Sequence, residues 1–348
     1  MPSPLSRWLP VIAFWTFPLL AMLSLSPSLR TFLLSRPSLT YALASVLPTI
    51  MLSRFVAPIR YYLRLTTFLV GLAANAMFGA IMALPMSLVG KGKDNQWLVA
   101  RSFVNTVAPL VGVKFRVEGR EHLDKANPAV LVGNHQTMVD ILYMGAVFPK
   151  GTSVMAKREL QWTPILGQWM TLSKAVFVNR AKREDAVKVF AKVAAKMKKN
   201  SLSLWIFAEG TRSASPTPSL LPFKKGAFHL AVQAGLPVVP IVCENYAHVY
   251  HAKAKRFNDG EIVVRVLEPI PTGGYTSSSA DIARLTELTR DRMLEAIEDL
   301  GRKRQEQLRL AGGQGHGEGE REALLAGQAG RASTSGETAS ARIEAPSE

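Results

Sequence analysis

The 348-residue sequence predicts an α/β domain, with a largely parallel sheet flanked by helices, behind an apolar N-terminal membrane region. Two observations lead to this fold class. From about residue 100, short runs of β-branched residues alternate with amphipathic stretches. Strand, helix and strand in succession favour a parallel sheet with helices packed on it. Before that point, residues 1–90 contain three uncharged stretches, six arginines and no Asp or Glu.

The three uncharged stretches are candidate membrane segments, at residues 8–29, 37–53 and 65–90. The third has 26 residues. At ~1.5 Å per residue it reaches roughly 39 Å, enough to cross a hydrocarbon core about 30 Å thick. The first is a span or the apolar part of a signal peptide, and its length favours a retained anchor. The second contains Pro48 and is a span or a re-entrant piece. Basic residues flank the third stretch on both sides, so the positive-inside rule gives no orientation.

The elements of the α/β domain follow in alternation. Strands are predicted at residues 113–119, 128–134, 175–179, 203–210, 237–242 and 261–270. Helices are predicted near residues 138–148, 183–199, 225–235 and 280–300. Residues 312–348 are rich in Gly, Ala, Ser and Glu, which predicts a disordered tail. The expected domains are a membrane region of one to three spans over 1–95, the α/β domain over 96–305, and a tail over 306–348.

Composition excludes several classes of protein. A hydrophobic content of 48% is too high for a chain that is disordered throughout. Cys243 is the only cysteine, which excludes a disulfide scaffold and a cysteine-based zinc site. A formal charge of +16 is typical of proteins that bind nucleic acid, membrane surfaces or anionic ligands. Since the N-terminal region is apolar and the common nucleic-acid-binding motifs are absent, we expect a membrane and no nucleic-acid partner.

His135 is the histidine best placed for chemistry, because it follows the apolar strand predicted at 128–134. Loops at strand ends are where α/β sheets place ligands and catalysts. Asp140 follows five residues later, and within one regular helix the two side chains would point ~140° apart. With His135 in the loop and Asp140 in the first turn of the next helix, the carboxylate can orient the imidazole as a general base. A loop histidine beside a helix-start carboxylate, with no catalytic role, explains the same spacing.

A second group of polar residues, Glu209 to Arg212, follows the strand predicted at 203–210. Glycine lets the backbone turn closely around a ligand. Threonine offers a hydroxyl, and the arginine fork suits a phosphate. The ionised glutamate accepts hydrogen bonds only, so it braces the arginine or accepts from a hydroxyl. A turn with a surface ion pair is the alternative for this segment taken alone.

Four motifs, NHQTMVD, AVFVNR, FAEGTRS and LPVVPIV, follow one another in the chain. Their order and spacing over about residues 110–270 resemble the glycerolipid acyltransferases, specifically the 1-acyl-sn-glycerol-3-phosphate acyltransferases of eukaryotic, fungus-like type. The sequence departs from that family at Ala208, where proline is usual, and at Asn179, where many members have aspartate. The first change affects loop stiffness more than chemistry, and the second leaves Arg180 in place.

The resemblance implies the glycerolipid-acyltransferase fold with N-terminal transmembrane helices, and it assigns roles to residues. His135 is then the general base and Asp140 its orienting carboxylate. Phosphate is held by the basic side chains, and the glycerol site is shaped by the residues before Arg212. The implied substrate-binding residues are Asn134, Lys157, Arg180, Glu209, Gly210, Thr211 and Arg212.

The implied reaction transfers a fatty acyl group from acyl-CoA to the sn-2 hydroxyl of 1-acyl-sn-glycerol-3-phosphate, or lysophosphatidic acid, giving phosphatidic acid in phospholipid biosynthesis. Acyl-CoA is a co-substrate, and no cofactor or metal is expected. Glycerol-3-phosphate or another lysophospholipid is the alternative acceptor, and a non-catalytic membrane-binding protein of the same fold is the alternative class. The expected location is the endoplasmic reticulum membrane, as an integral protein, with another cellular membrane or the lipid droplet as alternatives.

Overall fold

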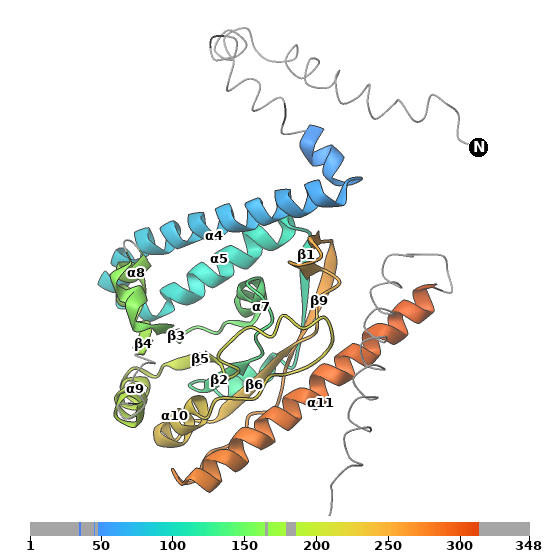
Figure 1. Ribbon diagram of the computed structural model, residues 1–348. Coiled ribbons are helices and arrows are strands. Elements are labelled where there is room, and N and C mark those ends of the chain that lie inside the picture. Colours follow the sequence, from blue (N-terminus) through green and yellow to red (C-terminus); the bar gives the residue numbers. More distant parts are fainter. Residues whose placement is uncertain (1–34, 36–44, 46–47, 164–165, 179–185, 313–348) are drawn as a thin grey trace, which may run out of the picture.

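The computed structural model describes residues 35, 45, 48–163, 166–178 and 186–312 (Figure 1). The first uncharged stretch, most of the second, Arg180 and the tail after residue 312 lie outside these described residues.

A seven-stranded sheet forms the centre of the domain, in the order β1-β9-β6-β2-β5-β3-β4. Every neighbouring pair is parallel except β6 and β9, which are antiparallel. This arrangement confirms the predicted largely parallel sheet. The strands are β1 (Val113–Glu118), β2 (Val130–Gly133), β3 (Thr152–Lys157), β4 (Val176–Val178), β5 (Ser203–Phe207), β6 (Val238–Cys243) and β9 (Gly260–Val266).

Six of these strands match the predicted ones, and β3 was not predicted. Its first residues, Thr152 and Ser153, are polar, which hides the strand in the sequence, yet both are buried in the sheet. A separate two-stranded hairpin of β7 (Tyr250–His251) and β8 (Arg256–Phe257) was not predicted either. Strands of two residues carry no detectable alternation of polar and apolar side chains.

Helices cover both faces of the sheet, because its strands are apolar on both sides (Figure 1). On β2, Leu131 belongs to the apolar cluster on one face of the sheet, whereas Val130 and Val132 belong to the cluster on the other face. The helices of the domain are η1 (Gly92–Asp94), α5 (Asn95–Leu110), α6 (Glu121–Lys125), α7 (Asp140–Val147), η2 (Arg158–Trp162), α8 (Leu166–Leu172), α9 (Ala186–Asn200), α10 (Gly226–Ala234) and α11 (Ser279–Gly312).

Helix α4 (Ala57–Leu88) contains most of the third uncharged stretch and packs along α5 (Figure 1). Its buried stripe meets the domain core, where the Phe68 and Phe103 rings lie 5.5 Å apart between centroids. The opposite side exposes large apolar side chains, among them Tyr62, Leu69, Val70, Met77, Ile81, Leu84 and Leu88. Among the described residues, α4 is the one helix long and apolar enough to cross a membrane.

Helix α5 begins at Asn95, next to the start predicted for the α/β domain at residue 96, and it is covered by α4. Helix α4, from the expected membrane region, therefore packs directly on the α/β domain. Helix α11 continues to Gly312, whereas the sequence predicted its end near residue 300 and the domain's end at 305. The added turns consist mainly of arginine, lysine, glutamine, glutamate and leucine, which are strong helix formers.

Candidate active site

The carboxyl ends of three neighbouring parallel strands form the site. His135 lies just beyond β2, Glu209 just beyond β5, and Cys243 ends β6, and β2 lies between the other two strands. The loops after β2 and β5 are joined, because the backbone N–H of Ser213 donates to the carbonyl of His135 at 2.8 Å. Residues that lie 74 or more positions apart in the sequence therefore meet at one edge of the sheet.

His135 lies in the loop after β2, and Asp140 is the first residue of α7. The imidazole Nδ1 and the carboxylate Oδ2 are 2.6 Å apart, so the predicted geometry of this pair is confirmed. Since Nδ1 faces an acceptor-only group, the neutral ring carries its proton there and leaves the lone pair of Nε2 free. The His135 side chain is 19% exposed, so a substrate hydroxyl has access to the ring.

The Asp140 carboxylate is 1% exposed and satisfied by converging donors. Oδ2 accepts from His135 and from the backbone N–H groups of Gln136 and Thr137, at 2.6 and 3.0 Å respectively. Oδ1 accepts from the Tyr246 hydroxyl. Burial raises the pKa of the Asp140 carboxyl, and the hydrogen bonds from His135 and Tyr246 oppose that shift. The carboxylate is therefore fixed in position and aimed at the imidazole.

Two aromatic residues that sequence reasoning missed complete the surroundings of the pair. The Tyr246 hydroxyl bonds both Asp140 and the Thr137 hydroxyl, the latter at 2.8 Å, and burial raises the tyrosine pKa well above its usual value. Phe207, the last residue of β5, stacks on the His135 ring with 4.1 Å between centroids and 14° between planes. Phe207 begins the FAEGTRS motif but drew no role from it, and Tyr246 lies four residues beyond the strand predicted at 237–242, where no sequence signal pointed to it.

Asn134 is buried, and both ends of its amide bond the backbone of Cys243. The Nδ2 group donates to the Cys243 carbonyl at 2.9 Å, and the Cys243 N–H donates to Oδ1 at 2.8 Å. This side chain joins the ends of β2 and β6 and thereby positions the loop that carries His135. Gly133 precedes it, where an added Cβ would lie 2.7 Å from the Tyr143 hydroxyl, so only glycine fits.

Glu209 is 2% exposed and holds the same loop from the other side. One carboxylate oxygen accepts the His135 backbone N–H at 2.7 Å, and the other accepts the Leu221 N–H at 2.9 Å. Burial raises the pKa of this carboxyl, and the two backbone hydrogen bonds oppose that shift. Gly210 follows with φ +72°, a left-handed conformation that favours glycine. In this structure Glu209 therefore supports the loop that carries His135 rather than bracing Arg212.

The remaining predicted residues differ in how they relate to this site. Thr211 and Arg212 are exposed on the loop after β5. Lys157 ends β3, which is separated from β2 by β5. Arg180 lies outside the described residues. The structure thus brings together His135, Asp140, Asn134 and the Glu209–Arg212 segment, all at the carboxyl ends of β2, β5 and β6.

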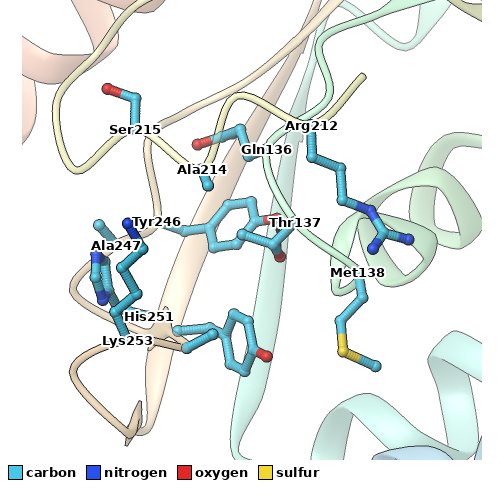
Figure 2. Close-up of a pocket in the computed structure, with 12 residues that line it drawn as sticks. Gln136, Thr137, Met138, Arg212, Ala214, Ser215, Tyr246, Ala247, His251 and Lys253 are labelled. Atoms are coloured by element: carbon cyan, nitrogen blue, oxygen red, sulfur yellow. Dashed lines mark hydrogen bonds between the residues drawn. The ribbon is translucent and has the colours of Figure 1, made fainter. Parts of the chain in front are cut away.

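A pocket of about 220 Å³ opens beside the loop that follows His135, and Figure 2 shows the residues that line it. It starts at Gln136, the residue after His135, and is walled by Arg212 from the loop after β5 and by Tyr246 from the loop after β6. Its far wall is the β7–β8 hairpin. The guanidinium of Arg212 has no hydrogen bond or ion pair with any described residue, which leaves its donors free for an anionic ligand.

The described side chains give less support to a cysteine nucleophile or to a bound metal ion. Cys243 is fully buried, and burial raises its thiol pKa well above the usual value, which removes both access and thiolate character. Within the described parts of the chain, no group of three or more His, Cys, Asp and Glu side chains is arranged to hold a metal ion.

Comparisons with known proteins show which family the chain belongs to. A family model described as Acyltransferase covers residues 114–244, which span the strand ends just described. An uncharacterized acyltransferase of Schizosaccharomyces pombe is 43% identical over 245 residues, which are 70% of this chain and 88% of that protein. The chain belongs to the acyltransferase family.

Further acyltransferases are similar over the same region. The 1-acyl-sn-glycerol-3-phosphate acyltransferase of Saccharomyces cerevisiae is 39% identical over 241 residues, 69% of this chain and 78% of that protein. The human 1-acyl-sn-glycerol-3-phosphate acyltransferase alpha is 37% identical over 243 residues, 69% of this chain and 84% of that protein. The fold is shared with the crystal structure of the 1-acyl-sn-glycerophosphate (LPA) acyltransferase PlsC from Thermotoga maritima, at TM-score 0.57 and 24% identity, over 71% of this acyltransferase and 98% of that chain.

Proposed function

We propose that this acyltransferase moves a fatty acyl group from acyl-CoA to the sn-2 hydroxyl of 1-acyl-sn-glycerol-3-phosphate and forms phosphatidic acid for phospholipid biosynthesis. The observation that carries the proposal is the oriented His135–Asp140 pair, with Nε2 unoccupied beside a pocket bordered by Arg212. The relatives named for this acceptor support it, since they match across 69% of the chain.

In the proposed reaction, His135 Nε2 takes the proton of the sn-2 hydroxyl as its oxygen attacks the thioester carbonyl. The new C–O bond forms and the C–S bond breaks, so the electron pair leaves with the CoA sulfur. A thiol has a pKa of about 8.5, which makes the thiolate a fair leaving group. The imidazolium then returns the proton to that sulfur, and the products are phosphatidic acid and CoA.

Asp140 makes this proton transfer efficient in two ways. It holds the imidazole in the tautomer that leaves Nε2 basic, and its charge stabilises the imidazolium formed during the attack. The chain needs no acyl-enzyme intermediate for this route. Without an acceptor, purified protein and acyl-CoA should therefore release no burst of CoA equal to the enzyme concentration.

A membrane location fits both the substrate and helix α4. The acceptor is a lipid, and α4 turns a row of exposed apolar side chains away from the domain. The amino-terminal end of α4 also contacts the pocket wall, where the Tyr61 and Tyr250 rings stack at 6.4 Å. We propose that the protein is integral to the endoplasmic reticulum membrane and takes its acceptor from the bilayer.

An acceptor screen on the purified full chain in mixed micelles tests the function. Acyl-CoA is offered with lysophosphatidic acid, glycerol-3-phosphate or lysophosphatidylcholine, and CoA release is measured together with the mass of the lipid product. The proposal requires phosphatidic acid, formed in a one-to-one ratio with CoA, as the preferred product. A clear preference for glycerol-3-phosphate or lysophosphatidylcholine would show that the proposed acceptor is wrong. If no acceptor leads to CoA release, the proposed acyl transfer itself is wrong.

A further inference from the structure

The β7–β8 hairpin is the most basic part of the pocket wall. Residues 245–258, which contain the hairpin, include Lys253, Lys255 and Arg256 and no Asp or Glu. Lys253 and His251 line the pocket, and Figure 2 shows them across the cavity from Arg212. Among the described residues that line the pocket, none is acidic. A cavity with cations on two sides and no acid concentrates anions.

Lys253 has no structural partner that explains its place. It is exposed, and it makes no hydrogen bond or ion pair with any residue that the structure describes. Arg256, the first residue of β8, instead donates to the Ala247 carbonyl at 3.1 Å and so secures the loop after β6. The ammonium group of Lys253 is therefore available to a ligand in the pocket.

His251 adds a hydrogen-bond donor beside this lysine. Its Nδ1 accepts the backbone N–H of Ala254 at 3.0 Å. Burial lowers the pKa of the imidazole, with Arg256 and Lys253 adding to the shift, so the ring is neutral near pH 7. A neutral ring that accepts at Nδ1 carries its proton on Nε2. That N–H is a donor, and a neutral donor next to an ammonium group suits a phosphate oxygen.

The hairpin is fixed in place rather than free to move, because α4 holds it through several contacts. Arg64 forms an ion pair with Asp259 at 2.7 Å and donates to the Phe257 carbonyl at 3.2 Å. The Tyr61 ring of α4 also stacks on the Tyr250 ring of the hairpin, with 6.4 Å between centroids. A wall held in this way loses little conformational entropy when a ligand binds.

From these contacts we infer that Lys253 and His251 form a second phosphate-binding subsite, opposite Arg212, which holds a phosphate group carried by one of the two substrates. The inference rests on the proposed function and extends it to residues outside the four sequence motifs. Both substrates of the proposed reaction carry phosphate esters: the acceptor at its glycerol, and the donor in its CoA moiety. Lys253 is then a specificity-determining residue that acts on substrate binding rather than on the chemical step.

Lys253→Gln and Lys255→Gln form the test and its matched control. Both lysines are exposed and lie on the same turn, and each change removes one charge, but only Lys253 lines the pocket. KM is measured for the acceptor at saturating donor, and for the donor at saturating acceptor. Lys253→Gln should raise one of the two KM values about three- to tenfold, as the loss of one exposed charge-assisted contact predicts, with kcat nearly unchanged. Lys255→Gln should leave both KM values within twofold.

Calorimetric titration separates failure of this inference from failure of the proposed function. Glycerol 3-phosphate and CoA are titrated into the wild-type chain and both variants, without any turnover. Weaker binding of glycerol 3-phosphate to Lys253→Gln assigns the subsite to the acceptor, and weaker binding of CoA assigns it to the donor. If Lys253→Gln binds both probes as the wild type does and keeps both KM values, the subsite does not exist. If the wild-type protein transfers no acyl group, the proposed function is refuted, whereas the binding titrations still decide whether the subsite exists.

Discussion

Tyr246→Phe isolates one hydrogen bond to the Asp140 carboxylate. The change removes only a hydroxyl, from a buried ring that keeps its shape. That hydroxyl is the donor to Asp140 Oδ1, whereas Oδ2 keeps its donors from His135, Gln136 and Thr137. A hydrogen bond to a charged group is worth about 1.5–3 kcal/mol. Because one pKa unit corresponds to about 1.36 kcal/mol, the pKa of the Asp140 carboxyl should rise by about one to two units.

The expected consequence is a change in the pH profile of kcat/KM. A less stabilised carboxylate holds its proton more tightly, so the acid limb of the profile should move to higher pH by about one unit. Loss of orientation of the imidazole should lower kcat/KM at pH 7 by roughly tenfold. The assay is CoA release with lysophosphatidic acid as acceptor, measured between pH 5 and 9.

Tyr143→Phe is the matched control. The Tyr143 hydroxyl is also buried but donates to the neutral backbone carbonyl of Asn134. Its loss should cost stability of about 1 kcal/mol without moving the acid limb. If Tyr246→Phe leaves the acid limb in place, or if Tyr143→Phe moves it equally, the role assigned to Tyr246 as a positioning residue for Asp140 is wrong.

Three further predictions concern the phosphate site, pH-dependent stability and the membrane. Arg212→Lys keeps the charge but loses the planar fork, so it should raise the KM for lysophosphatidic acid several-fold; a change confined to the donor KM contradicts the assignment. Burial raises the pKa of Glu244 to about 7 from an ordinary value of 4.5. The folded state therefore loses roughly 3 kcal/mol of stability as the pH rises through that range, and Glu244→Gln should remove this loss. The difference in Tm between Glu244→Gln and the wild type should therefore be more positive at pH 8 than at pH 5. If this difference does not depend on pH, the raised pKa of Glu244 is contradicted. The native cysteine is fully buried, so single cysteines can be labelled selectively. Ile81 on α4 and Leu310 on α11 are similarly exposed in the fold, at 65% and 69%. In membranes, Ile81→Cys should nevertheless react with a water-soluble maleimide far more slowly than Leu310→Cys, because lipid covers the exposed side of α4. Equal rates in membranes contradict lipid contact at α4.

The sequence predicted the parts of the site that depend on short-range spacing. His135 and Asp140 are five residues apart, and a strand end followed by a helix start brings them together. The largely parallel sheet follows in the same way from alternating strands and helices. Six of the seven strands of the main sheet were therefore predicted, together with the loop that carries His135.

What the sequence could not predict depends on which strands become neighbours. Tyr246 reaches Asp140 only because β6 lies next to β2, although 106 residues separate the two side chains. The same sheet order turns Glu209 toward the His135 backbone, where the sequence suggested a place in the glycerol site. The close packing of α4 on α5 was also unforeseen, because an apolar stretch looks the same whether protein or lipid covers it.

The measurement that tests the central claim most directly is the turnover of His135→Ala in the full-length protein. Acyl transfer from acyl-CoA to lysophosphatidic acid is compared with wild type, and folding is checked by circular dichroism and Tm. Since the imidazole is the proposed general base, kcat should fall by about 10²–10⁴-fold while the fold is retained. Asp140→Asn should also be severely impaired, because the ring loses its orienting carboxylate. Near-wild-type turnover by a folded His135→Ala protein would contradict the account.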